Sequence, residues 1–194
     1  KCTFDEGSQL EQAEAVLAER KGEVALVTID IGGNDLLACV RGGAQIDAAC
    51  VTKGVATVEK NLPTILERLR TAAGPEVPVL VLGYYNPWVA AQTLDQPVEG
   101  VEEAAQGYAD LSDAIEAAAD GAGATFVSLD EAFATNDTTP TEIGGRTIPE
   151  NAARVCTLTN LCTARDIHFS DEGAATVARV LADAATTAGV GAAS

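Results

Sequence analysis

His168, the only histidine of the chain, follows an aspartate in Asp166-Ile167-His168. The pair resembles the acid and base of a catalytic site. An imidazole titrates near neutral pH, so histidine is the side chain that most often serves as a general base. A carboxylate two residues away can orient the ring or stabilise its cation, as the acid of a catalytic triad does. An exposed histidine beside a solvated loop carboxylate gives the same pattern, so a second catalytic group is needed to decide.

Asn34 is the second residue whose type and setting could do chemistry. It stands in Gly32-Gly33-Asn34-Asp35, directly after an apolar run. Glycines let the backbone turn sharply. A side-chain amide held at such a turn can donate a hydrogen bond to the oxyanion of an acyl-transfer reaction. The same four residues also form ordinary turns in which Asn and Asp bind their own backbone, so this motif alone leaves both interpretations open.

The elements that must position these groups alternate along the chain. Apolar runs predict buried strands at residues 24–31, 77–83 and 124–129. Amphipathic or capped segments predict helices at residues 8–20, 36–40, 52–73, 101–119 and 170–188, and polar stretches predict loops at 84–88 and 135–160. Alternating strands and helices indicate an α/β domain with a parallel sheet. Ligands bind at the carboxyl ends of such strands, and residues 32–35 and 84–88 both follow a strand.

Length and charge restrict the class of protein. The 194 residues fit one domain, so we treat 1–194 as a single domain. The net charge is −17, from 29 acidic and 12 basic residues, which would repel a phosphate backbone or an anionic membrane surface. Nucleic acid is therefore not an expected partner. No stretch reaches the roughly 18 apolar residues of a transmembrane helix.

The five cysteines indicate an oxidising compartment. None forms a CxxC motif, and one histidine is too few for a Cys/His zinc cluster, so no metal and no organic cofactor is expected. Cys39 lies close to Cys50, and Cys156 lies close to Cys162, so we expect these two disulfides and a secreted, extracellular protein. Cys2 is left over, and we expect its partner to be a cysteine upstream of Lys1.

The order of these motifs resembles the SGNH hydrolase superfamily, also called the GDSL family, and most of all its secreted actinobacterial branch. The resemblance covers nearly the whole chain. Besides Gly32-x-Asn34-Asp35 and Asp166-x-His168, it includes Ser8-Gln9-Leu10, residues 27–32, Tyr84-Tyr85-Asn86-Pro87 and Asp171-Glu172-Gly173. It implies a three-layer α/β/α, flavodoxin-like fold and a lipase or carboxylesterase that works through an acyl-serine intermediate.

The resemblance also implies a role for each matching residue. Asn34 looks like the oxyanion-hole asparagine, and Gly32 is similar to the glycine that opens that block. His168 looks like the catalytic base, and Asp166 is the candidate acid. The usual spacing is DxxH, however, and Phe169 replaces the proline that usually follows the histidine. A backbone carbonyl is therefore the alternative partner of the ring.

The expected substrate is a small-molecule or lipid ester. Tyr84, Tyr85 and Trp88 in the loop after the second strand, together with Leu37, suit an acyl chain. The alternative is that these side chains pack against the long loop at 135–160.

A nucleophile is missing from the pattern. The family's serine stands in a Gly-Asp-Ser-like motif after its first strand, and a second block supplies a further oxyanion donor, but the chain contains neither. Its serines are Ser8, Ser112, Ser128, Ser170 and Ser194. Ser8 and Ser170 are better explained as helix caps. We therefore expect this chain to be the C-terminal portion of an SGNH hydrolase domain, with the first strands and the serine upstream, and to be inactive alone.

Two other functions compete with the hydrolase. A non-catalytic SGNH-like module that binds an ester, a glycan or a protein partner would also lack the serine. A nucleotide-binding α/β domain is disfavoured because neither GxGxxG nor GxxxxGK[ST] follows any predicted strand.

Overall fold

The computed structural model describes residues 3–5, 7–41, 45–93 and 98–191. Its helices are α1 (Gln9–Glu19), α2 (Gly33–Leu37), α3 (Ala48–Ala73), α4 (Val101–Gly121), α5 (Glu150–Leu158), α6 (Leu161–Ala164) and α7 (Asp171–Thr187), with a 3-10 helix η1 (Pro87–Thr93). Its strands are β1 (Val27–Ile29), β2 (Val40–Arg41), β3 (Gln45–Ile46), β4 (Val79–Leu82), β5 (Thr125–Val127), β6 (Pro140–Ile143) and β7 (Arg146–Pro149).

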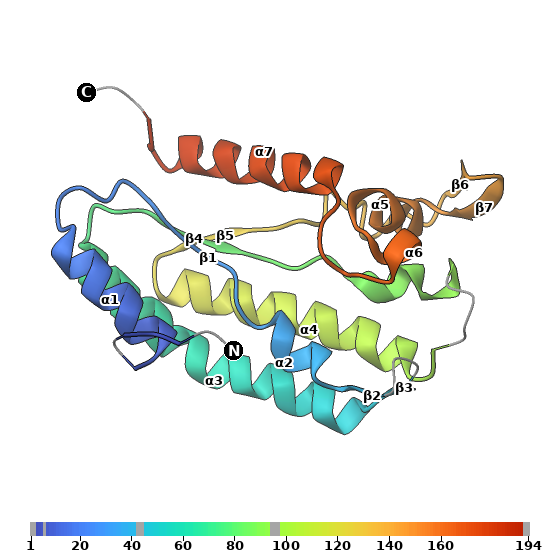
Figure 1. The fold of residues 1–194 in the computed structure, drawn as a ribbon, viewed down its shortest axis with the longest axis horizontal. Helices are drawn as coiled ribbons and strands as arrows, with labels where there is room; N and C mark the ends of the chain where they lie inside the picture. Colours follow the sequence, from blue (N-terminus) through green and yellow to red (C-terminus); the bar gives the residue numbers. More distant parts are fainter. Residues whose placement is uncertain (1–2, 6, 42–44, 94–97, 192–194) are drawn as a thin grey trace.

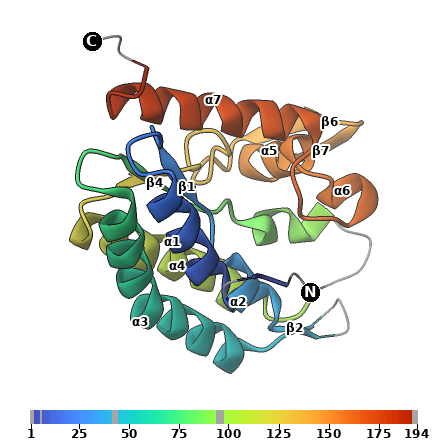
Figure 2. The ribbon, with the colours of Figure 1, turned by 60° about the vertical axis from the view of Figure 1, so that its left-hand side comes forward.

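A parallel sheet of three strands, in the order β1-β4-β5, forms the centre of the fold. Val27 pairs with Val79, and Val81 pairs with Phe126. Helices α3 and α4 cover one face of this sheet, and α7 lies across the other, as Figures 1 and 2 show. The predicted α/β architecture with a parallel sheet is therefore confirmed. Two short antiparallel hairpins, β2-β3 and β6-β7, lie outside the sheet.

Strand β4 explains why the sheet needs helices on both faces. All four of its residues are buried. Val79 and Val81 belong to the apolar cluster that α3 and α4 complete. Leu80 and Leu82 belong to a second cluster with residues of α5 and α7. Successive side chains of a strand point to opposite faces, so the unbroken apolar run seen in the sequence is the expected signature of a doubly covered strand.

Helix caps fix where several helices begin. The Ser8 hydroxyl accepts a hydrogen bond from the Glu11 amide at 3.2 Å, and the Ser170 hydroxyl accepts one from the Gly173 amide at 3.1 Å. Both caps were predicted and are confirmed. Helix α3 begins at Ala48, four residues before its predicted start, because the Asp47 carboxylate accepts from the Cys50 amide at 3.1 Å.

Two predicted segments were wrong. The short helix expected at 36–40 is instead α2, which begins at Gly33 because Gly32, with φ of 116°, turns the chain directly out of the sheet. The loop expected at 135–160 contains the hairpin β6-β7 and helix α5. Gly144 and Gly145, with φ of 57° and 77°, make the tight turn of that hairpin. Neither element was predicted because the segment is largely polar.

Both predicted disulfides are present. Cys39–Cys50 joins the residues after α2 to the first turn of α3, and Cys156–Cys162 joins α5 to α6. Cys2, for which an upstream partner was expected, lies outside the described residues. Among the helices of the described ranges, none combines the length and the apolar character that a membrane crossing requires.

Gly173→Ala tests how closely α7 packs on α5. A Cβ at position 173 would lie 1.8 Å from the Leu158 carbonyl oxygen. Overpacking of this kind costs about 1–3 kcal/mol, so urea unfolding should show a loss of that size. Gly121→Ala is the matched control, because nothing lies within 4 Å of its Cβ position. Alanine is the better helix former, so the control should be neutral or up to about 1 kcal/mol more stable. Equal stability of the two variants would contradict the packing described here.

Candidate active site

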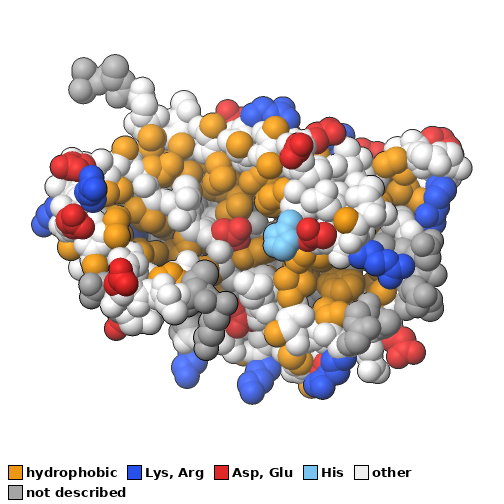
Figure 3. Space-filling model, viewed as in Figure 1, with side chains coloured by type: hydrophobic (Ala, Val, Ile, Leu, Met, Phe, Trp, Pro, Cys, Tyr) orange, Lys and Arg blue, Asp and Glu red, His pale blue; other side chains and the backbone are white. Residues whose placement is uncertain are grey.

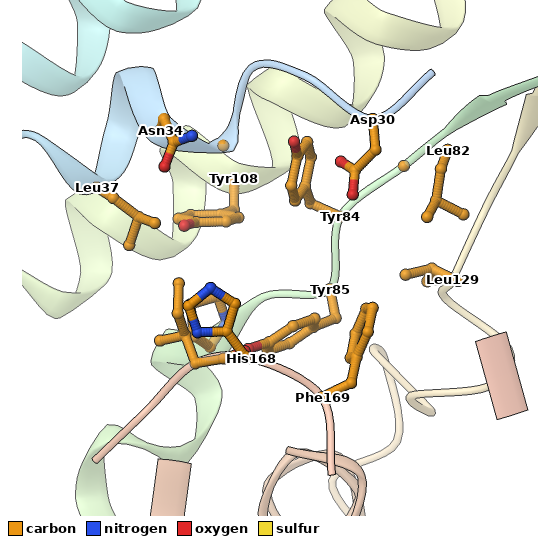
Figure 4. Close-up of a pocket in the computed structure, with 14 residues that line it drawn as sticks. Asp30, Asn34, Leu37, Leu82, Tyr84, Tyr85, Tyr108, Leu129, His168 and Phe169 are labelled. Atoms are coloured by element: carbon orange, nitrogen blue, oxygen red, sulfur yellow. The ribbon is translucent and has the colours of Figure 1, made fainter. Parts of the chain in front are cut away.

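A pocket of about 230 Å³ opens at the carboxyl ends of β1 and β4. Asn34 comes to it from α2, Tyr84 and Tyr85 from the residues after β4, and His168 from the loop between α6 and α7. Figure 4 shows Asn34 and His168 on opposite sides of this space, with Tyr108 between them in the view. Groups 134 residues apart in sequence therefore face one cavity.

Asn34 owes its place to the two glycines before it. Gly32 is the N-cap of α2, and its carbonyl accepts from the Asp35 amide at 3.0 Å. Gly33 is buried, and a Cβ there would lie 2.6 Å from the Tyr84 ring, so only glycine fits at this position. Asn34 is exposed and lines the pocket, whereas Gly32 is buried and does not line it. An amide at this position can donate to an anion in the pocket.

His168 and Asp166 form a close pair. The His168 Nδ1 atom lies 2.5 Å from Asp166 Oδ1, and the same oxygen accepts from the His168 backbone amide at 3.0 Å. The imidazole side chain is 84% exposed and the carboxylate 47%. An ionised carboxylate can only accept, so the ring proton resides on Nδ1. The Nε2 atom is then free to accept a proton, which is the protonation state that a general base needs.

The His168 backbone amide, with the His168 ring as a second donor, lowers the pKa of Asp166 below its ordinary value of 3.8. In this structure the neighbour of Nδ1 is thus the Asp166 carboxylate, despite the shortened DxH spacing.

Aromatic side chains make up much of the pocket wall. Burial raises the pKa of Tyr84, with the nearby Asp30 as a second cause, and burial also raises the pKa of Tyr85 and Tyr108. The three hydroxyls therefore stay protonated across the physiological range. Trp88, by contrast, packs against the core on the α3/α4 side and is not among the residues that line the pocket.

Asp30 and Tyr108 line the pocket and were not singled out from the sequence. Asp30 directly follows β1, so its place at the strand's carboxyl end was an available signal. Tyr108 lies on the buried face of α4, where nothing in its spacing distinguishes a pocket residue from a core residue.

None of the described serines lines the pocket. Ser8 caps α1, and Ser170 caps α7 while donating to the Thr157 carbonyl at 2.8 Å. Ser128 donates to Asp130 at 2.9 Å, and Ser112 lies within α4. Ser194 is outside the described residues. Across the described ranges, no three His, Cys, Asp or Glu side chains are placed to hold a metal ion.

The chain matches the model of the GDSL-like Lipase/Acylhydrolase family over residues 3–176. It therefore belongs to this family, and its resemblance to the SGNH/GDSL superfamily is confirmed. At the family level this assigns it to the ester hydrolases. A comparison with curated proteins found no match.

A titration of Asp166 tests the histidine pair in solution. The carbon-detected NMR signal of its carboxyl group should have a midpoint below 3.8, because two donors stabilise the ionised form. A pKa lowered by folding stabilises the folded state above the ordinary pKa, and that contribution is lost as pH falls through the lowered value. The Asp166–His168 contacts should therefore persist down to this low midpoint.

His168→Ala is the control for that titration. It removes the ring but keeps the backbone amide, so the pKa of Asp166 should rise only part of the way towards its ordinary value. A midpoint at or above 3.8 in the unmodified protein would show that the pair does not form.

Proposed function

We propose that this chain forms the C-terminal portion of a secreted serine ester hydrolase, a lipase or carboxylesterase that works through an acyl-serine intermediate. The observation that supports this most directly is that His168 and Asn34 face the same pocket from opposite sides, with His168 paired to Asp166. Base, acid and amide donor are three of the four parts of a serine hydrolase. The fourth, the serine, is proposed to come from a segment upstream of Lys1.

In the proposed reaction, His168 Nε2 takes the proton from the serine hydroxyl as its oxygen attacks the ester carbonyl carbon. The carbonyl oxygen becomes an oxyanion, to which the Asn34 side-chain amide donates. Gly32, assigned to the same oxyanion-hole block, contributes the turn that presents Asn34 to the pocket. The imidazolium, stabilised by Asp166, then gives its proton to the departing alcohol. Water, deprotonated by the same Nε2, attacks the acyl-serine. When this second oxyanion collapses, the imidazolium returns its proton to the leaving serine oxygen, which releases the acid and restores the serine.

The open edge of the sheet supports an upstream segment. In the described part of the chain, β1 pairs with β4 on one side and with no strand on the other. A groove of about 700 Å³ runs along that free side, lined by apolar side chains of α1, β1 and α3, among them Val16, Ile29 and Ile65. Hydrophobic side chains gather on the face shown in Figure 3, beside the exposed histidine. A strand added there would end beside Asn34, at the edge where the pocket opens.

The substrate is proposed to be a small-molecule or lipid ester. Tyr84 and Tyr85 line the pocket and offer apolar ring surface to an acyl group. Trp88, to which a substrate-binding role was also assigned, is half-buried against the core and does not line this pocket. Two disulfides fit an extracellular location, because such bonds persist in oxidising compartments.

Turnover of a p-nitrophenyl ester tests the proposal. A protein that contains the upstream segment should hydrolyse it, and residues 1–194 alone should not, because the nucleophile is absent. In the longer protein, His168→Ala should abolish turnover. Asn34→Ala should lower kcat by about 10²–10³-fold, the usual effect of removing one oxyanion donor. Thr186→Ala, an exposed change in α7 whose hydroxyl bonds only to the Ala182 carbonyl of the same helix, serves as the control.

If the 194-residue chain alone hydrolyses the ester and His168→Ala abolishes this activity, the proposal that the nucleophilic serine lies upstream of Lys1 is wrong. An inactive longer protein would instead favour a non-catalytic module that binds an ester, a glycan or a protein partner.

A further inference from the structure

The backbone around His168 is held by hydrogen bonds to three consecutive carbonyls. The Tyr85 hydroxyl donates to the Ile167 carbonyl. The Asn160 backbone amide donates to the His168 carbonyl at 3.0 Å. The Asn160 side-chain amide donates to the Phe169 carbonyl at 3.1 Å and reaches the His168 carbonyl at 3.4 Å. Two residues thus bind every carbonyl of the segment that presents the imidazole.

Asn160 is itself fixed in place. It lies in the short loop that the Cys156–Cys162 disulfide closes between α5 and α6. Its own carbonyl accepts from the Ala164 amide at 2.8 Å and from the Asp166 amide at 3.4 Å. The preceding residue, Thr159, is buried and donates to the Val155 carbonyl at 2.6 Å. Asn160 therefore connects the rigid end of α5 to both sides of the histidine loop.

Tyr85 is equally constrained. Its side chain is buried, and its ring stacks on Phe133 with centroids 4.5 Å apart and planes 10° apart. Phe169 packs against the same ring at 5.9 Å. Since burial also raises the pKa of Tyr85, its hydroxyl remains a donor throughout the pH range of an esterase.

The imidazole has few constraints of its own. Its side chain is 84% exposed, and among the described residues its polar side-chain contact is with Asp166. The direction of the ring therefore depends on the backbone beneath it. Catalytic groups lose effect steeply when misplaced, by about 10²-fold for a displacement of 1 Å. A loop outside regular structure needs such support.

We propose that Asn160 and Tyr85 are positioning residues: by binding the carbonyls of residues 167–169 they hold the His168 ring against Asp166, with Nε2 available to a nucleophile. Neither residue touches the reacting atoms. The catalytic consequence rests on the proposed function, whereas the state of the ring does not, so the two are measured separately.

Nitrogen NMR of the one histidine tests the ring directly in the 194-residue protein. At a pH where the imidazole is neutral, the unmodified chain should show mainly the form with the proton on Nδ1. Asn160→Asp is nearly isosteric but replaces the donor by an acceptor, so the fraction of this form should fall, as it should in Asn160→Ala. Tyr85→Phe, which removes only the hydroxyl, should act in the same direction. The order parameter of the His168 amide should fall from about 0.85 towards 0.6.

Thr157→Ala is the matched control, because it truncates an exposed polar side chain three residues from Asn160 without removing a carbonyl. It should leave the ring and the order parameter unchanged. Thermal unfolding of each variant separates a general loss of stability from the local effect. An Asn160→Asp protein that keeps the Nδ1–H form and the rigid amide would overturn the proposal.

Kinetics of the longer protein give the second readout. Asn160→Ala and Tyr85→Phe should lower kcat about 10–100-fold with KM unchanged. If a variant loses the Nδ1–H form of the ring but keeps the kcat of the unmodified longer protein, the catalytic part of the proposal is wrong. If the unmodified longer protein is inactive, the proposed function fails while the ring measurement still decides the role of the two residues.

Discussion

The parallel pairing of β1, β4 and β5 is the constraint on which the pocket depends. Strands that run in one direction end at one edge, so the residues that follow β1 and β4 meet there. The alternation of β4 ends with the strand: Tyr84 packs against the cluster beneath α3 and α4, whereas Tyr85 belongs to the same cluster as Leu80 and Leu82, beneath α5 and α7. The course of the chain after β4 thus brings Tyr85 to the histidine loop, where its hydroxyl donates to the Ile167 carbonyl.

The second cluster links this sheet to the histidine. Helix α7 begins at its Ser170 cap, where the Ser170 amide donates to the Leu158 carbonyl at 3.0 Å, and Gly173 allows the close approach to α5. The isolated bridge between Thr159 and Phe169 lies beside this contact. The loop that presents His168 is therefore anchored at both ends by one packed unit, although the imidazole itself is exposed.

The sequence predicted the parts of the structure that follow from short-range patterns. The strands and the caps at Ser8 and Ser170 follow from apolar runs and local hydrogen bonding. The β6-β7 hairpin was missed because its strands are largely exposed and polar, although Gly144-Gly145 was a turn signal. Ala152, Val155 and Leu158 recur at helical spacing, but helix α5 was missed because polar residues surround them.

The candidate site was predictable in its motifs and less so in its wall. Asn34 and His168 stand in recognisable patterns, and the structure brings both to one pocket. The contacts of Tyr85 and Asn160 with the histidine loop join residues up to 82 positions apart, and no local pattern encodes them. Trp88 resembles a pocket residue in sequence, yet in the 3-10 helix that begins at Pro87 it is half-buried against the core and does not line the pocket.

The central claim is that His168 and Asn34 serve a serine that lies outside residues 1–194. Labelling of the longer protein with a fluorophosphonate, followed by mass spectrometry of its peptides, tests this most directly, because the probe forms a covalent bond only with an activated serine. The account predicts one modified serine upstream of Lys1, with labelling lost in His168→Ala. A modified serine within residues 1–194, or no modified serine at all, would contradict it.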